Sequence, residues 1–257
     1  MPEYDLSVLF YLMAAGFVAA FFDAVIGGGG AIAVPALLAA GMPPEFALGT
    51  NKMAGSMGTF TSGLTFLMHG KVNRRLVSAL FPLSILGSAL GVIALQSVPA
   101  GLLRPLMAVL LIMITVYTLV HKEWGSRSTF QGITGKAAVS MILAALGISF
   151  YDGFFGPGTG SFLIFTFLLL GFNFVESAAN AKVLNFGSNL AALVMFAHFG
   201  TIHYFYGVIM GGGMVFGAAA GARTAILRGN AYVKLLYVLM SCVLIGRMIW
   251  GSLSAYV

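Results

Sequence analysis

Long apolar stretches alternate with short polar ones along the whole chain. A helix needs about 20 residues at 1.5 Å each to cross the hydrocarbon core of a bilayer, and most of the apolar stretches approach or exceed that length. The pattern therefore predicts an all-α, polytopic membrane protein. The predicted helices cover residues 6–26, 31–42, 45–69, 76–96, 104–121, 136–155, 157–171, 175–199, 204–225 and 232–251.

Two of these stretches, 31–42 and 157–171, are short for a membrane span. Each follows a glycine-rich break, and we expect each to form a helical hairpin with the stretch before it. The hairpins 6–42 and 136–171 either cross the bilayer twice or re-enter on one side, and the sequence leaves both forms open. The topology of the remaining helices is the same in both cases.

Composition excludes several other classes of protein. Hydrophobic residues make up 60% of the 257 residues and charged residues only 8%, whereas an average soluble domain carries roughly 25% charge. Disorder, a solenoid and an ordinary soluble enzyme are thereby excluded, and the single cysteine, Cys242, excludes a disulfide scaffold. The 34 glycines are about twice the usual share of ~7%, so their positions need an explanation.

The second half of the chain repeats the first. Asp23 matches Asp152 at an offset of 129, and Lys52 matches Lys182 at an offset of 130, after one inserted residue. Charged residues inside apolar stretches are rare, so two such matches indicate an internal duplication. Each repeat then holds one hairpin and three transmembrane helices. The predicted units are an N-terminal membrane repeat 1–122, a cytoplasmic linker 123–135 and a C-terminal membrane repeat 136–257.

The distribution of positive charge predicts that the two repeats are inverted in the membrane. The loop with Lys71, Arg74 and Arg75 is strongly positive, whereas its counterpart at 201–203 contains no Lys or Arg. Because cytoplasmic loops carry an excess of Lys and Arg, this arrangement places both termini outside, as in inverted-repeat transporters. The net charge of +6 is explained by topology, and no nucleic-acid partner is expected.

Two lysines inside predicted helices are the first candidates for chemistry. Lys52 and Lys182 each lie about seven residues into a helix, or roughly 10 Å deep. Ionisable groups at that depth are costly and indicate a functional site. The inverted arrangement brings the two lysines from opposite faces toward the midplane. Neutral polar residues accompany them, namely Thr50, Asn51, Ser56 and Thr59 in the first half and Asn180, Asn185, Ser188 and Asn189 in the second.

The glycine-rich breaks predict backbone cradles for an anion. Glycine lets N–H groups approach a ligand, and a helix that starts there presents free N–H groups and a positive dipole end. Pro157 fits the first turn of such a helix. Together with the lysines, the breaks suit a small anion. The predicted binding residues are Lys52, Lys182, Asn51, Thr50, Asn180, Asn185, Gly28, Gly29, Gly30, Gly158, Thr159 and Gly160.

Asp23 and Asp152 precede the two breaks and have two possible roles. Burial favours the neutral form of a carboxylic acid, which makes both candidates for coupling transport to a proton. Alternatively, they form buried salt bridges with Lys52 and Lys182. A salt bridge favours the charged carboxylate and weakens the coupling role, but it does not exclude a part in binding.

Other motifs carry less weight. The four histidines show no metal-ligand spacing, and no histidine lies beside an aspartate at helical spacing within a span. We therefore expect no metal, no cofactor and no enzymatic activity. A separate group of glycines at small-xxx-small spacing is expected to allow close helix packing. These are Gly87, Gly91, Gly217 and Gly221.

Several strings in both halves resemble the TauE/SafE family of sulfite and organosulfur-anion transporters, and the resemblance covers nearly the whole chain. Met53-Ala54-Gly55 follows Lys52 where many members carry Leu-Gln-Ser, and this difference leaves the substrate open. The strings are Phe22-Asp23, Gly27-Gly28-Gly29-Gly30, Val34-Pro35-Ala36-Leu37, Ala47-Leu48-Gly49-Thr50-Asn51-Lys52, Gly70-Lys71-Val72, Phe150-Tyr151-Asp152-Gly153-Phe154-Phe155-Gly156-Pro157-Gly158-Thr159-Gly160 and Asn180-Ala181-Lys182.

The resemblance implies a permease of the bacterial inner membrane, usually an exporter, for sulfite or an organosulfonate. We expect alternating access, with a small anion, a coupling proton or cation, the lipid bilayer and a second copy of the chain as partners. The termini are predicted to be periplasmic. Three other readings are an anion channel or permease for another small anion, an intramembrane enzyme, and an accessory subunit of a larger complex.

Overall fold

The computed structural model describes residues 6–99, 102, 130 and 135–254. Every element within these residues is helical, which confirms the all-α prediction. The predicted helix 104–121 lies outside the described residues, as does nearly all of the linker 123–135. The helices are α1 (Leu6–Ile26), α2 (Gly30–Ala39), α3 (Pro44–Met68), α4 (Arg74–Gln96), α6 (Gly135–Phe154), α7 (Thr159–Leu169), α8 (Phe174–His198) and α9 (Tyr204–Ser254).

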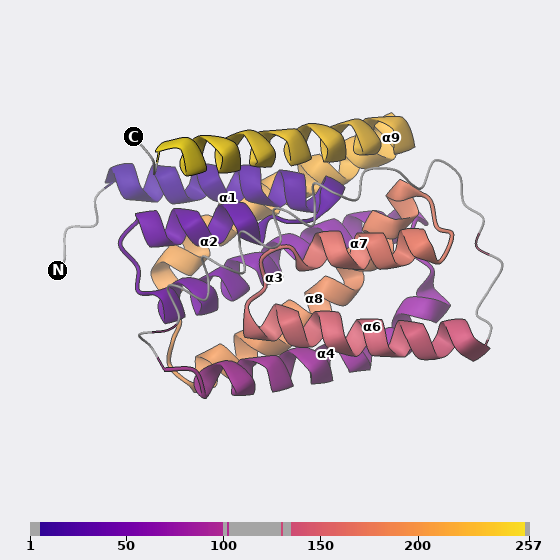
Figure 1. Cartoon of the computed structure of the whole chain (residues 1–257), viewed down its shortest axis with the longest axis horizontal. Helices are drawn as coiled ribbons and strands as arrows, with labels where there is room; N and C mark the ends of the chain where they lie inside the picture. The colour runs from indigo at the N-terminus through magenta and orange to yellow at the C-terminus, as the bar shows by residue number, and fades with distance from the viewer. Residues whose placement is uncertain (1–5, 100–101, 103–129, 131–134, 255–257) are drawn as a thin grey trace.

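The helices form a bundle in which α3 and α8 occupy the middle (Figure 1). Helix α1 packs mainly on α9 along one side, and α4 packs mainly on α6 along the other. Helices α3 and α8 contact each other, and they also contact α9 and α4 respectively. The short helices α2 and α7 follow α1 and α6 as the second arms of two hairpins. Helices from the two halves of the sequence are therefore interleaved.

Glycines in the left-handed backbone region end corresponding helices in the two halves. Gly41 (φ 84°) follows α2, and Gly171 (φ 90°) follows α7. Gly70 (φ 66°) follows α3, and Gly200 (φ 71°) follows α8. Side chains other than glycine rarely adopt such angles. Each pair of glycines is separated by the offset of 130 seen in the sequence.

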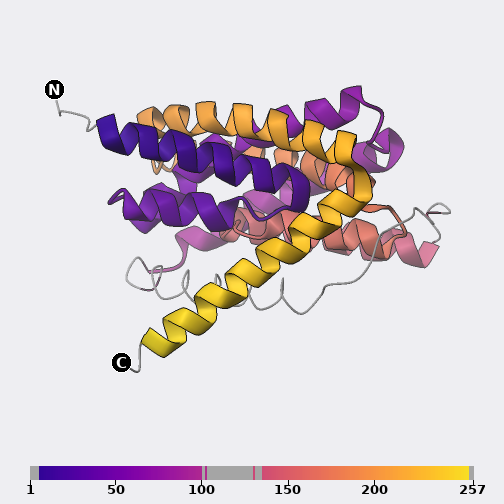
Figure 2. The same ribbon diagram turned by 90° about the horizontal axis from the view of Figure 1, so that it is seen from above.

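Helix α9 contains a break that separates the two helices predicted at 204–225 and 232–251. Gly229 has φ 73° and ψ −167°, which is not a helical conformation. Figure 2 shows the chain changing direction within α9 and running back diagonally toward the C-terminus. The sequence prediction of two helices here is consistent with this geometry.

Four glycines bring helix backbones into contact, as the small-residue spacing predicts. A Cβ atom at Gly87 or Gly91 of α4 would collide with main-chain carbonyls of α6. A Cβ atom at Gly217 or Gly221 of α9 would collide with the carbonyls of Phe17 and Phe21 in α1. These glycines therefore serve helix packing, and the prediction for them is confirmed.

The outer surface of the bundle is apolar. Phe10, Leu143 and Phe216 are 65%, 64% and 71% exposed, and a soluble protein rarely exposes many large apolar side chains together. Helices α1, α4 and residues 204–233 of α9 are long and apolar enough to cross a membrane. Helices α3 and α8 have 25 residues each, and their polar residues are mostly buried against other helices. A polytopic membrane protein is confirmed, while the inversion of the repeats remains a prediction.

Candidate functional site

The site begins at the two glycine breaks that separate α1 from α2 and α6 from α7. Gly27 and Gly28 have φ values of 76° and 90°, and Gly156 and Gly158 have values of 98° and 88°. Matching these conformations pairs Gly27 with Gly156 and Gly28 with Gly158, so Pro157 is the inserted residue. Pro157 lies before the first residue of α7, and the prediction that it starts that helix is corrected. Gly158 is the N-cap instead, because the turn requires a positive φ at this position.

The two breaks lie against each other near the centre of the bundle. A Cβ atom at Gly27 would collide with the backbone of Gly160 and Ser161. The Ser161 hydroxyl donates a hydrogen bond to the carbonyl of Ile26 at 3.1 Å. Only glycine at position 27 permits this approach. The backbones of the two hairpins therefore meet at one place in the structure.

A buried ion pair joins α3 to α6. The Nζ atom of Lys52 lies 2.8 Å from Oδ1 of Asp152. Lys52 also donates a hydrogen bond to Oδ1 of Asn189 in α8 at 3.2 Å. The Lys52 and Asp152 side chains are 2% and 3% exposed. Two charges removed from water require each other, since a buried charge without a partner is strongly unfavourable.

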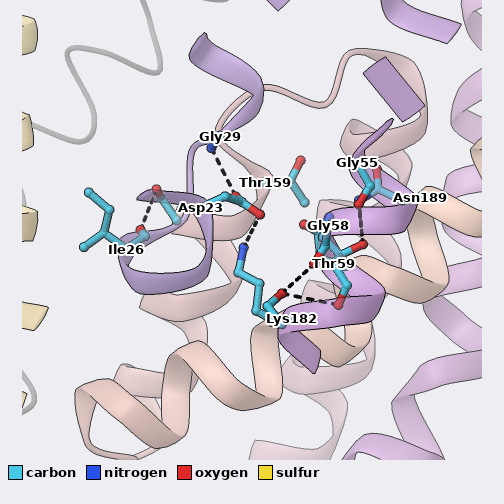
Figure 3. Close-up of polar contacts among 12 residues, drawn as sticks. Asp23, Ile26, Gly29, Gly55, Gly58, Thr59, Thr159, Lys182 and Asn189 are labelled. Atoms are coloured by element: carbon cyan, nitrogen blue, oxygen red, sulfur yellow. Dashed lines mark hydrogen bonds and ion pairs between the residues drawn. The ribbon is translucent and has the colours of Figure 1, made fainter. Parts of the chain in front are cut away.

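A second ion pair joins α8 to α1. The Nζ atom of Lys182 lies 2.7 Å from Oδ2 of Asp23. The other oxygen of Asp23 accepts a hydrogen bond from the backbone N–H of Gly29 at 3.1 Å (Figure 3). Each lysine is therefore paired with the aspartate of the other half of the chain. The structure adopts the salt-bridged arrangement that the sequence left as an alternative.

The two aspartates differ in their other partners. The Ser188 hydroxyl donates to Oδ2 of Asp152 at 2.6 Å, and the Asn185 amide donates to the same oxygen at 3.3 Å. The residues 130 positions earlier are Gly58 and Gly55, which have no side chain to donate. Asp23 consequently receives no side-chain hydrogen bond from α3.

Between the breaks and the ion pairs lies a partly open polar cavity of about 40 Å³. Its wall includes both breaks, both aspartates and Lys52. The backbone N–H groups of Gly30 and Gly160, which line it, have no hydrogen-bond partner among the described residues. A polar cavity with free N–H donors at helix starts is suited to a small anion.

Ten of the residues predicted from the sequence line this cavity. They come from both halves of the chain, as the prediction of one shared site requires. From the first half these are Asp23, Gly28, Gly29, Gly30, Asn51 and Lys52. From the second half they are Asp152, Gly158, Gly160 and Asn185.

Four predicted residues lie elsewhere. Lys182 is fully buried behind Asp23, and the hydroxyl of Thr159 donates to the carbonyl of Gly156 at 2.7 Å. Thr50 accepts a hydrogen bond from the backbone N–H of His203 at 2.9 Å. Asn180 accepts one from the backbone N–H of Asn73 at 2.8 Å. Thr50 and Asn180 thus hold the loops that precede α9 and α4.

Replacing Thr50 with Val or Asn180 with Leu is expected to destabilise the fold without weakening anion binding. Each change leaves a backbone N–H without its partner, which costs about 1–3 kcal/mol. Thermal unfolding of the purified variants should show a melting temperature lowered by a few degrees, and anion affinity should stay within about twofold of wild type. Asn51→Leu, at the cavity wall, is the matched comparison and should weaken binding. A tenfold loss of affinity in Thr50→Val at an unchanged melting temperature contradicts this assignment.

Four further residues belong to the site. The sequence places Ser188 and Asn189 near the lysines without predicting that they bind the anion, and it does not single out Gly55 and Gly58. Asn189 and Ser188 complete the Lys52–Asp152 pair, and Gly55 and Gly58 form part of the cavity wall. Gly55 and Asn189 lie three and seven positions from a buried lysine, a spacing that puts them on the same helix face. Gly58 and Ser188 lie six positions away and carry no such signal. Among the described residues, no group of three His, Cys, Asp or Glu could hold a metal ion.

Comparison with known proteins agrees with a membrane transporter. The family model for the sulfite exporter TauE/SafE matches residues 12–248. A probable membrane transporter protein of Haemophilus influenzae is 38% identical over 97% of this chain and 98% of its own length. Probable membrane transporter proteins from a Sinorhizobium species (ORF9) and from Escherichia coli K12 (YfcA) are 36% and 33% identical, over 97% and 96% of this chain and 95% and 90% of their own lengths. No solved structure matches.

Proposed function

Because this chain belongs to the sulfite exporter TauE/SafE family, we propose that it is a secondary transporter for a small sulfur-containing anion. The proposed substrates are sulfite and organosulfonates. The proposed direction is export across the bacterial inner membrane, and the proposed mechanism is alternating access. Both termini face the periplasm in this proposal. The anionic substrate binds in the cavity between the glycine breaks.

The observation that carries this proposal is the convergence of both breaks on one cavity. The N–H groups of Gly30 and Gly160 are free to donate to an anionic oxygen, and the amides of Asn51 and Asn185 border the same space. Lys52 and Lys182 supply the compensating charge. Asp23 and Asp152 are paired with them, so their carboxylates are the groups through which a proton can be coupled to anion movement.

Alternating access also has support in how the helices are assembled. The two hairpins touch at the breaks, and each ion pair links helices that belong to different halves. A rocking motion between the halves changes the access to a site at their interface. A channel with the same cavity is the second candidate. Currents in a planar bilayer distinguish the two, since a channel passes far more ions per second than a carrier.

Neutralising both ion pairs is expected to abolish transport. The variant carries Lys52→Met, Asp152→Leu, Lys182→Met and Asp23→Leu, so that no buried charge is left without a partner. Uptake of radiolabelled sulfite and of a two-carbon sulfonate into proteoliposomes should fall to the level of empty vesicles, a loss of about 100-fold or more for two lost charge contacts.

Arg223→Ala is the control for that experiment, because Arg223 is an exposed cation of α9. It should transport at close to the wild-type rate. A neutralised variant that remains folded, as judged by size-exclusion chromatography, and still carries both anions contradicts the proposed site.

A further inference from the structure

We propose that the two ion pairs perform different tasks. The Asp23–Lys182 pair opens: the anion replaces the Asp23 carboxylate beside Lys182, and Asp23 takes up a proton. The Lys52–Asp152 pair stays closed and holds the halves together. This assignment rests on the proposed function and adds which of the two aspartates accepts the coupling proton.

Asp152 is held too firmly beside Lys52 for an anion to replace it. Its carboxylate contacts Lys52 at 2.8 Å, Ser188 at 2.6 Å and Asn185 at 3.3 Å. Lys52 in turn donates to Asn189. Each of these contacts must break before Asp152 can leave Lys52, so together they oppose its replacement by an anion.

Asp23 has few of these restraints. Its side chain is 19% exposed, against 3% for Asp152, and it lines the cavity. Gly55 and Gly58 occupy the positions that correspond to Asn185 and Ser188. The missing side chains remove the hydrogen-bond donors and also leave room beside the carboxylate, because both glycines border the cavity.

Lys182 is suited to receive the anion. Its ammonium is buried and has no polar partner among the described residues except Asp23, so its remaining donors are free. A Cβ atom at Gly160 would lie 2.9 Å from Nζ of Lys182 and 3.1 Å from Oδ1 of Asp23. The absence of that atom lets the Gly160 backbone lie close to both the ammonium and the carboxylate. An anion that displaces Asp23 then lies beside the ammonium and this backbone.

The exchange balances in charge and protons. Before it, Lys182 is cationic and Asp23 is anionic; after it, Lys182 is paired with the anion and Asp23 is a neutral acid. One proton therefore binds at the site together with each monoanion, and the buried site stays neutral. The charged groups that face Asp23 are Lys182 from α8, Lys52 from α3 and Asp152 from α6. Helices α2, α7 and α9 contribute no titratable side chain to the described cavity wall.

Calorimetry of anion binding tests the assignment. Methanesulfonate is the probe, because its sulfonate stays ionised across the working range, so any proton taken up from the buffer must bind to the protein. Titrations of detergent-purified protein at pH 8, in two buffers with different ionisation enthalpies, give the number of protons bound with each anion. Wild type should take up about one proton, since the acid is formed as the anion binds.

The two aspartate variants then identify the acceptor. Asp23→Asn mimics the neutral acid, so its affinity for methanesulfonate at pH 8 should exceed that of wild type and its proton uptake should fall to zero. Asp152→Asn should still take up about one proton. Binding without proton uptake in wild type, or uptake that persists in Asp23→Asn, overturns the assignment. Failure of wild type to bind methanesulfonate or sulfite at any pH contradicts the proposed function itself, and the assignment with it.

A second pair of variants does not alter any charged residue. Gly55→Asn is expected to offer Asp23 the donor that Asn185 gives to Asp152, and Gly55→Leu has the same branched shape without the donor. A Cβ atom at this position meets nothing closer than 3.7 Å, so both should fold. Gly55→Asn should bind methanesulfonate about tenfold more weakly than Gly55→Leu at pH 8, because it stabilises the charged form of Asp23. Equal affinities overturn the assignment.

Discussion

Lys52→Met is expected to prevent stable folding of this protein or to lower its melting temperature by roughly 10 °C. Breaking a buried ion pair from one side costs about 3–5 kcal/mol, and each kcal/mol corresponds to about 2–4 °C for a chain of this size. The cause is Asp152, which is 3% exposed and would be left buried with no cation beside it. Thermal unfolding in detergent, followed by intrinsic fluorescence, measures the effect.

The double variant Lys52→Met with Asp152→Leu is the control. It removes the whole pair, and replacing a buried ion pair with apolar side chains is often neutral or stabilising. Its melting temperature should recover to within a few degrees of wild type. A single variant as stable as wild type would mean that Asp152 is compensated in some other way, and the ion pair would then lose its structural role.

Gly91→Ala is expected to have the second largest effect. The added methyl group would collide with the carbonyl of Phe150 and would lie 2.7 Å from the backbone nitrogen of Phe154. Backbone atoms cannot rotate away, so α4 and α6 must separate along their contact. Overpacking of this kind costs about 1–3 kcal/mol or more, and we expect the melting temperature to fall by roughly 5–10 °C.

Gly147→Ala on α6 is the matched comparison, since a Cβ atom there meets nothing within 4 Å. Alanine is the better helix former by about 1 kcal/mol, so this variant should be as stable as wild type or slightly more stable. The two substitutions are chemically identical and lie on helices that pack together. Equal melting temperatures for both would argue against close backbone packing between α4 and α6.

The helices could be predicted well from the sequence because a bilayer imposes one simple rule on them. Helix α1 ends where the apolar run 6–26 ends, and α3 differs from the run 45–69 by one residue at each end. The turns were also predictable, since Gly41 and Gly171 mark them at matching positions. The sequence motifs resembled the TauE/SafE family, and the comparisons confirmed that the chain belongs to it.

The partners within the site could not be predicted in the same way. The sequence shows that Asp23, Lys52, Asp152 and Lys182 are buried candidates, but it does not show which aspartate meets which lysine. That choice depends on how α1 and α6 are placed around α3 and α8. Thr50, two residues before Lys52, points away from the cavity because two steps along a helix turn through about 200°.

Each ion pair joins a residue of the first half to a residue of the second half, and this pairing constrains how the protein is made. Ribosomes deliver the first half to the membrane before the second, so Asp23 and Lys52 enter the bilayer while Lys182 and Asp152 are still unsynthesised. Their native counter-charges arrive only after α6 and α8 have been inserted. Until then the early helices must keep their charges hydrated, pair them provisionally with each other, or rest against the insertion machinery. Biogenesis of this protein is therefore completed by its last helices.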